Sequence, residues 1–142
     1  MLTLEPQIIA RIKTEAPGLS TVASVGFLAG AQDIAPYIPA AFVIPGGAQY
    51  TAAGADGGPL TETQHWEVVL YVKHVKDPAD LATTSSLAGP LLEGIVGALH
   101  GWRFDRRHHP MAIAARPDPV YYPGFGEFPL SFETRRVVTG TN

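Results

Sequence analysis

The chain has 142 residues, 46% of them hydrophobic, which is enough for one domain with a buried core. It contains no cysteine, so disulfides, thiolate metal sites and cysteine nucleophiles are excluded. The formal net charge of −3 argues against general attraction of nucleic acid, and no segment has the roughly 20 apolar residues that cross a bilayer, so we expect neither a membrane segment nor an export signal.

The first eighteen residues predict a short amphipathic helix. Leu4, Ile8 and Ile12 recur at helical spacing, Pro6 suits the first turn, and the Pro-Gly pair at residues 17–18 ends the run. The following stretch, LSTVASVGFLAGA, predicts only a weak strand or an extended link, because alanine and glycine dilute its β-branched residues. A buried strand with one end at a sheet edge is then expected at residues 41–44, which prolines bound on both sides.

Residues 46–64, GGAQYTAAGADGGPLTETQ, predict a long flexible loop within a single domain that spans residues 1–142. Tyr50 and Leu60 are the only side chains with substantial apolar area in this stretch. Ordering each backbone residue costs about 1–2 kcal/mol, so the stretch is expected to be mobile until a partner supplies more surface. Loops of this length are usually functional or disordered, and Tyr50 is the expected anchor.

The second half predicts a strand, a long helix and two further strands. In HWEVVLYVKHV, Trp66, Val68 and Leu70 alternate with a more mixed face, as in a strand that a helix covers on one side. A core helix follows the Asp-Pro pair at residues 77–78, with Pro90 expected to kink or divide it. Its apolar stripe is expected to comprise Leu81, Leu87, Leu91, Ile95, Val96 and Leu99.

Two strands are predicted near residues 111–116 and 128–137, separated by a proline-broken turn. The order of helix, strands, helix and strands indicates an α+β fold. We expect a mainly antiparallel or mixed β-sheet, flanked by an N-terminal helix and one long core helix.

The segment GALHGWRFDRRHHP, residues 97–110, concentrates histidines and arginines. A metal site is not favoured, because His108 and His109 are adjacent and point to opposite sides of an extended segment, and Asp105 is the only carboxylate nearby. The histidines, with His100, are interpreted as surface loop residues. No metal is predicted.

The arginines of this segment have two interpretations. Arg103, Arg106 and Arg107 could contact phosphate, but their position after the core helix favours a role at its negative C-terminal end, where carbonyls need donors.

Catalytic signatures are missing from the sequence. The hydroxyls at residues 83–86 are not set in a nucleophile motif and are expected on an exposed helix face, and the glycine pairs at residues 46–47 and 57–58 lack the Lys-Ser/Thr step of a phosphate loop. His65 and His74 are expected on opposite faces of their strand. We therefore predict no catalytic residue and no cofactor, and interpret the glycine-rich stretch, the arginines and the aromatic VYYPGFGEFP as contact surfaces.

Four segments together resemble the phage tail terminator family, whose small proteins cap the tail tube of long-tailed phages as a ring. They are AAFVIPGG, HWEVVLYVKHVKDPAD, LLEGIVGALHGWRF and GEFPLSFETRR, and the match in order and spacing covers about residues 42–136. The resemblance implies a structural virion protein without cofactor or catalytic residues, and a homohexameric ring with one face on the last tube ring and the other toward the neck. It also makes Gly101 and Trp102 a helix corner, with Trp102 folded back on the core.

On this resemblance the expected partners are other copies of the chain, the tail tube protein and the head–tail connector or neck proteins. Genomic DNA would only pass through the lumen, no membrane is involved, and the protein would sit at the head-proximal end of the virion tail after assembly in the host cytoplasm. The expected contacts with neighbouring subunits or the tube are Tyr50, Leu60, Arg103, Arg106, Arg107, Tyr121, Tyr122 and Phe125.

Two alternatives stay open at this point. A small enzyme would need a pH-sensitive histidine near a carboxylate. A nucleic-acid-binding module would need the loop arginines to align with Arg135 and Arg136 on one face.

Overall fold

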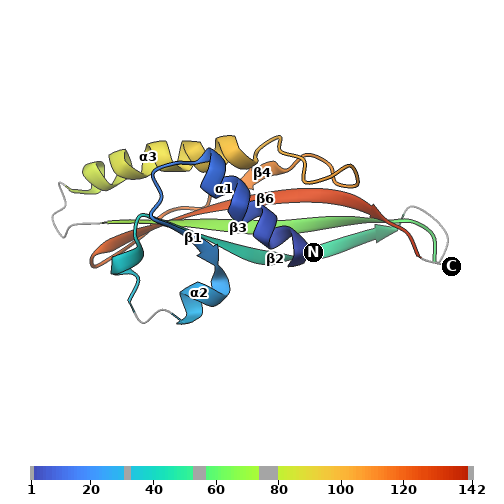
Figure 1. Ribbon diagram of the computed structural model, residues 1–142, viewed down its shortest axis with the longest axis horizontal. Coiled ribbons are helices and arrows are strands. Elements are labelled where there is room, and N and C mark those ends of the chain that lie inside the picture. Colours follow the sequence, from blue (N-terminus) through green and yellow to red (C-terminus); the bar gives the residue numbers. More distant parts are fainter. Residues whose placement is uncertain (1, 31–32, 53–56, 74–79, 141–142) are drawn as a thin grey trace.

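The computed structural model describes residues 2–30, 33–52, 57–73 and 80–140 (Figure 1). The elements are η1 (Leu2–Leu4), α1 (Glu5–Glu15), β1 (Thr21–Ser24), α2 (Val25–Gly30), η2 (Ala35–Tyr37), β2 (Ala40–Ala52), β3 (Leu60–Lys73), α3 (Asp80–Leu99), β4 (Ala112–Ala115), β5 (Val120–Tyr122) and β6 (Phe125–Val138).

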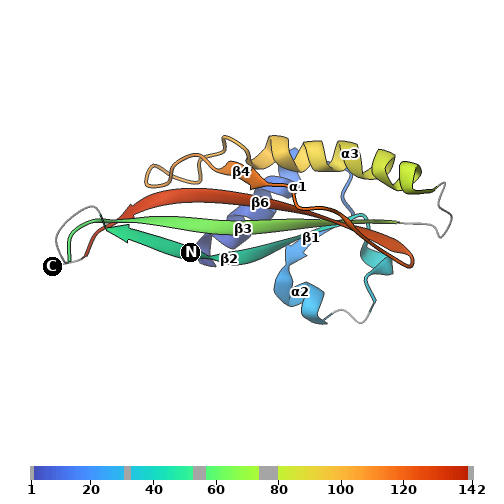
Figure 2. The ribbon, with the colours of Figure 1, turned by 180° about the vertical axis from the view of Figure 1, so that it is seen from behind.

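The strands form one mixed sheet of six strands in the order β1-β2-β3-β6-β4, with β5 also paired to β6. β1 runs parallel to β2, and the other pairs are antiparallel. Helices α1 and α3 lie on one face of the sheet and α2 lies on the other (Figures 1 and 2). The predicted α+β class, with an N-terminal helix and one long core helix, is confirmed.

Alternation along β3 builds two apolar clusters. Trp66, Val68 and Leu70 face α1 and α3 in the main core. Val69 and Tyr71 face the opposite way and pack with Phe42 in a smaller cluster beside α2 and η2. Because both faces of the central strand are covered, β3 is buried almost continuously from Trp66 to Val72.

Helix α3 corrects two expectations about the core helix. It runs from Asp80 to Leu99 without a break, so Pro90 does not divide it. Pro90 lies on the exposed side, while Ala88 and Leu92 on either side of it are buried against the sheet, and this packing holds the helix together across the missing donor. Leu92 occupies the core in place of the predicted Leu87, which is 53% exposed.

Part of the expected helix start and helix face lies outside the described residues. The proposed cap at residues 77–78 and His74 belong to an undescribed segment, as do the side chains of residues 81 and 83. None of the described helices is long and apolar enough to cross a membrane.

The glycine-rich stretch 46–64 is largely β-structure, so its prediction as a loop is wrong. β2 continues to Ala52, and β3 begins at Leu60. Gly46 and Gly47 form a β-bulge in β2, where the register with β3 shifts between Pro45 and Ala48. Gly47 has φ +84°, and a Cβ on Gly46 would lie 3.0 Å from the carbonyl oxygen of His65. The glycines therefore serve a bulge in a strand; residues 53–56 lie outside the described part.

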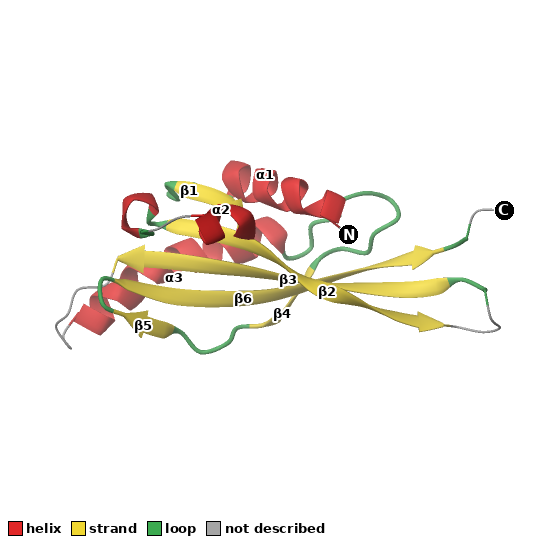
Figure 3. Ribbon diagram, turned by 90° about the horizontal axis from the view of Figure 1, so that it is seen from below, coloured by secondary structure: helices red, strands yellow, loops and turns green. Residues whose placement is uncertain are grey.

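The outer parts of three strands extend past the helices toward the C-terminus (Figures 1 and 3). They comprise residues 48–52 of β2, 60–64 of β3 and 134–138 of β6, which pair with one another in register. We call these residues the arm, and the helix-covered remainder of the sheet the body.

Candidate assembly surfaces

A buried carboxylate ties the strands of the arm together. Glu62 is only 2% exposed, and its oxygens accept hydrogen bonds from the Tyr50 hydroxyl at 2.5 Å, the Gln64 side-chain nitrogen at 2.5 Å and Arg136 Nε at 2.8 Å. Tyr50 comes from β2 and Arg136 from β6, so one side chain of β3 links all three strands. Trp66 continues the chain of contacts into the body by donating from Nε1 to the Gln64 oxygen at 3.4 Å.

The charge state of Glu62 follows from these donors. Burial alone would raise the pKa of its carboxyl, but the hydrogen bonds from Tyr50, Gln64 and Arg136 outweigh burial and lower the pKa to about 2. The hydrogen bond to Glu62 in turn raises the pKa of the Tyr50 hydroxyl. At neutral pH the arm therefore contains an ionised carboxylate paired with Arg136, whose side chain is 33% exposed.

The outside of the arm is open to a partner. β1 pairs with β2 only as far as Val43, so beyond that residue the outer edge of β2 faces no other strand among the described residues. Such an edge presents unpaired N–H and C=O groups to any chain that comes alongside. Tyr50 and Val137 are each 57% exposed on the arm, and Leu60 is partly exposed.

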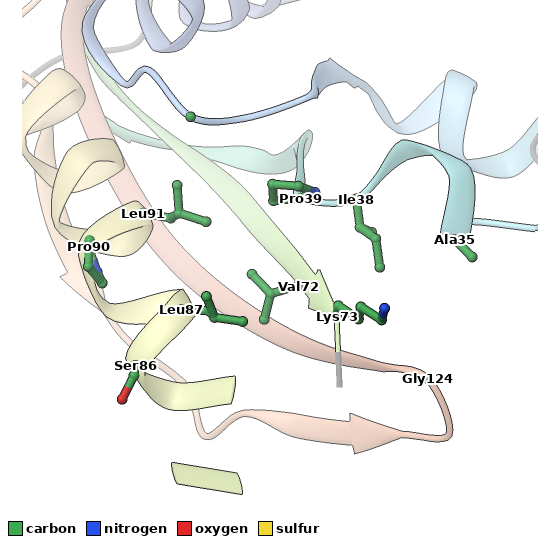
Figure 4. A pocket seen from close by; sticks show the side chains of 11 residues that line it. Ala35, Ile38, Pro39, Val72, Lys73, Ser86, Leu87, Pro90, Leu91 and Gly124 are labelled. Carbon is green, nitrogen blue, oxygen red and sulfur yellow. The ribbon is translucent and has the colours of Figure 1, made fainter. Parts of the chain in front are cut away.

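An apolar groove occupies the opposite end of the molecule (Figure 4). Its volume is about 720 Å³, and its walls come from α3, the end of β3 and the segment before β2. The side chains that line it include Ile38, Pro39, Val72, Leu87 and Leu91. The exposed side chain of Leu87 therefore belongs to a recessed apolar surface.

The aromatic turn between β5 and β6 lies at this same end (Figure 1). Tyr121 and Tyr122 are 39% and 40% exposed. Phe125 is half-buried, stacks on Tyr122 with ring centroids 5.0 Å apart and meets the edge of Tyr71 at 5.6 Å. Phe125 thus contributes to the smaller apolar cluster, while the two tyrosines remain open to solvent.

The loop after α3 turns at Gly101, which has φ +82°. We call residues 100–111 the corner loop. Its ends are joined by two backbone hydrogen bonds of 2.7 Å, from Gly101 to Met111 and from Met111 to Trp102. Trp102 is half-buried against the main core, as the family resemblance implied for this corner.

One C-terminal carbonyl of α3 accepts a hydrogen bond from another helix, and the carbonyls of Val96 and Leu99 accept from the backbone of His100 and Trp102. Arg11 of α1 donates from Nε to the carbonyl oxygen of Ala98 at 2.9 Å and lies 5.9 Å above the Trp102 ring. The guanidinium groups of Arg103, Arg106 and Arg107 are exposed and make no hydrogen bond or ion pair with the described residues. Their assignment to the helix end was wrong, because a cation from α1 already occupies that position.

His108 is not a surface residue as predicted. It is 5% exposed, and its Nδ1 lies 2.7 Å from Asp105 Oδ1. That hydrogen bond, which outweighs partial burial, lowers the pKa of Asp105. The Asp-x-x-His spacing was the available signal for this contact. His109 and His100 are exposed, and the described residues contain no group of three or more side chains that could hold a metal.

The hydroxyls of α3 also need a correction. Thr84 is only 2% exposed, whereas Ser85 and Ser86 are exposed as expected.

The expected contact residues lie at three separate places. Tyr50 and Leu60 belong to the arm, the three arginines to the corner loop, and the aromatic residues to the β5–β6 turn.

Comparison with known proteins identifies a family and solved structures with a similar fold. The family described as "Phage tail terminator protein" matches residues 2–142. A chain from a structure entitled "Virion of native gene transfer agent (GTA) particle" has a TM-score of 0.50 and 16% sequence identity, and the alignment covers 96% of this chain and 89% of that one. At this identity the similarity concerns the fold. No curated protein matches the chain significantly.

Proposed function

This chain belongs to the phage tail terminator protein family, a family of structural, non-enzymatic virion tail proteins, and we propose that it caps the tail tube as a closed ring of identical subunits. One face of the ring ends tube polymerisation by covering the last tube ring. The other face receives the head or neck of the virion, and the genome passes through the lumen. Six copies is the number that the family resemblance implies.

The arm is the observation that carries this proposal. Three strands project beyond the helices, and the outer edge of β2 has no strand partner among the described residues after Val43. The buried Glu62 network holds the arm in one shape before any partner arrives. A preformed edge loses less conformational freedom on binding than a flexible loop, so it suits a permanent contact between subunits or with the tube.

A ring also needs a second surface that differs from the first. Contacts between unlike surfaces repeat from copy to copy and close when the rotation between copies allows it. The groove beside Leu87 and the exposed Tyr121 and Tyr122 lie at the end opposite the arm, which makes that end the second surface of the proposed ring.

A trimmed arm tests this proposal. Tyr50 and Glu62 are cross-strand partners, so residues 51–61 can be replaced by an Asn-Gly turn between them. Tyr50, Glu62 and their partners Gln64 and Arg136 all remain, and we expect a folded subunit that no longer caps tubes. The matched control replaces Asp118, an exposed loop residue away from the arm, with asparagine.

The measurement is the length of assembled tubes by electron microscopy, together with the mass of the complex on the tube. The wild type and the control should give tubes of defined length with a ring at one end. Overgrown, uncapped tubes are expected with the trimmed subunit. Normal capping by the trimmed subunit, or a single wild-type copy on each tube end, would contradict the proposal.

A further inference from the structure

Three arginines of the corner loop differ from every other arginine of the chain. Each of the others has a carboxylate partner, in the pairs Arg11–Glu15 at 3.2 Å, Arg116–Glu93 at 3.2 Å, Arg135–Glu133 at 3.4 Å and Arg136–Glu62 at 2.8 Å. No carboxylate partner among the described residues is found for Arg103, Arg106 or Arg107, and all three are exposed. Three unpaired cations therefore lie within five residues of one loop.

The loop that carries them is held in place from several directions. Asp105 Oδ1 accepts the backbone N–H groups of Arg107 at 2.8 Å and His108 at 2.9 Å. The backbone N–H of His109 donates to the carbonyl of Arg135 at 2.7 Å, and the Thr134 hydroxyl donates to the carbonyl of His109 at 2.8 Å. The one acid in the loop is thus engaged with its own backbone and with His108, and the cations are presented on a fixed frame.

This surface lacks the apolar centre of a protein interface. Its two rings, Trp102 and Phe104, pack against the main core and are half-buried. The large hydrophobic side chains that are exposed elsewhere on the described surface do not include any residue of the corner loop. Stable protein interfaces centre on buried aromatic or aliphatic anchors, whereas binding to a nucleic-acid backbone relies on cations.

We infer that the corner loop contacts the phosphate backbone of double-stranded DNA, independently of base sequence. Arginine matches phosphate because its planar group donates two parallel hydrogen bonds. The loop pairs with the backbone of β6 at Arg135 and Arg136, but these adjacent strand residues point to opposite faces of the sheet and each has a carboxylate partner, so the inference rests on the three loop arginines alone. Because the whole chain carries a net charge of −3, the contact is weak and reversible, as a genome that must move past it needs.

The inference rests on the proposed ring, since a subunit in that position lies in the path of the genome. The probe is a short duplex DNA of random sequence, and binding is followed by fluorescence anisotropy over a series of salt concentrations. Three proteins are compared in the state they adopt in solution: the wild type, the triple variant R103Q/R106Q/R107Q and the control R116Q. Arg116 is also an exposed cation, and its partner is Glu93, so the control removes a charge away from the loop.

The wild type should bind the duplex at low salt, and its slope of log K against log salt should be about −0.9 for each arginine that contacts a phosphate. The triple variant should lose measurable binding, and R116Q should retain it. Tube capping is measured on the same samples. Absence of DNA binding by a wild type that caps tubes normally would overturn the inference and leave the ring intact. Equal DNA binding by the triple variant and the wild type would also overturn it, and a concurrent loss of capping would assign the loop to an acidic protein surface.

Discussion

The arm continues three strands of the body, but the two parts are held together by different forces. In the body, Trp66, Val68 and Leu70 are buried under α1 and α3 and exclude water. In the arm, the same face of β3 carries Glu62 and Gln64, which are equally buried but paired through hydrogen bonds. The body is stabilised by burial of apolar area, which does not depend on the orientation of individual groups. The arm depends instead on a few directional hydrogen bonds. A sheet can therefore extend beyond its apolar core when a polar network takes over its interior.

The largest effect is expected from the body. Trp66→Ala removes a fully buried ring and should lower the free energy of unfolding by about 3–5 kcal/mol. Trp102→Ala is the comparison, because Trp102 is only half-buried and should cost less. Denaturant unfolding of both variants measures the difference. Equal losses from the two tryptophans would show that the degree of burial of the ring does not set the size of the effect.

In the arm, Arg136→Ala should lower the free energy of unfolding by about 3 kcal/mol, because it leaves the carboxylate of Glu62 buried without its cation. The double variant Arg136→Ala/Glu62→Ala should recover part of this loss, since no charge is then left unpaired. Unfolding of the wild type, the single variants Arg136→Ala and Glu62→Ala and the double variant forms a double-mutant cycle. Additive effects would mean that the network does not hold the arm.

Acid should weaken the arm before it affects the apolar core. The pKa of Glu62 is about 2 in the folded protein, against an ordinary value of 4.5, so its stabilising effect is fully present above pH 4.5 and is lost as pH falls toward 2. The difference between these two pKa values corresponds to a contribution of at most about 3 kcal/mol to the free energy of unfolding. Glu62→Gln should make stability less dependent on pH in this window. Identical pH profiles for the wild type and the variant would contradict the assignment.

The smallest effect on stability is expected at Tyr50, where two substitutions distinguish a role in stability from a role in assembly. Tyr50→Phe removes the hydroxyl that donates to Glu62 and should cost about 1 kcal/mol or less, because the ring is 57% exposed. Capping should survive Tyr50→Phe and fail with Tyr50→Ala if the ring itself makes the contact. Tube length and thermal unfolding are measured on the same preparations. Normal capping by Tyr50→Ala would remove this residue from the contact surface.

Sequence periodicity was sufficient for the elements that pack on a single apolar stripe. The spacing of Ile8 and Ile12 predicted α1, and the alternation around Trp66 predicted β3. The family resemblance agreed with this order of elements and has been confirmed for nearly the whole chain. The α+β class could thus be reached without coordinates.

The arm could not be predicted because its signals depend on tertiary contacts. Gly46 and Gly47 are typical of a loop in isolation, and only the pairing of β2 with β3 makes them a bulge. Glu62 and Gln64 look solvated by type, yet they are buried because Arg136, distant in sequence, meets Glu62. Likewise, the donor to the end of α3 comes from Arg11, 87 positions from its acceptor Ala98. The roles of the expected contact residues remain predictions.

Hydrogen exchange along β2 tests the assembly role of the arm most directly. It is measured on the free monomer and on subunits bound to capped tubes, with residues 66–72 of β3 as the internal reference. Amides on the outer edge of β2, in residues 46–52, should exchange fast in the free monomer and slowly on the tube, while the reference stays slow in both. Slow exchange at this edge in a verified monomer, or equally fast exchange on capped tubes, would contradict the proposal that the arm is where subunits or the tube bind.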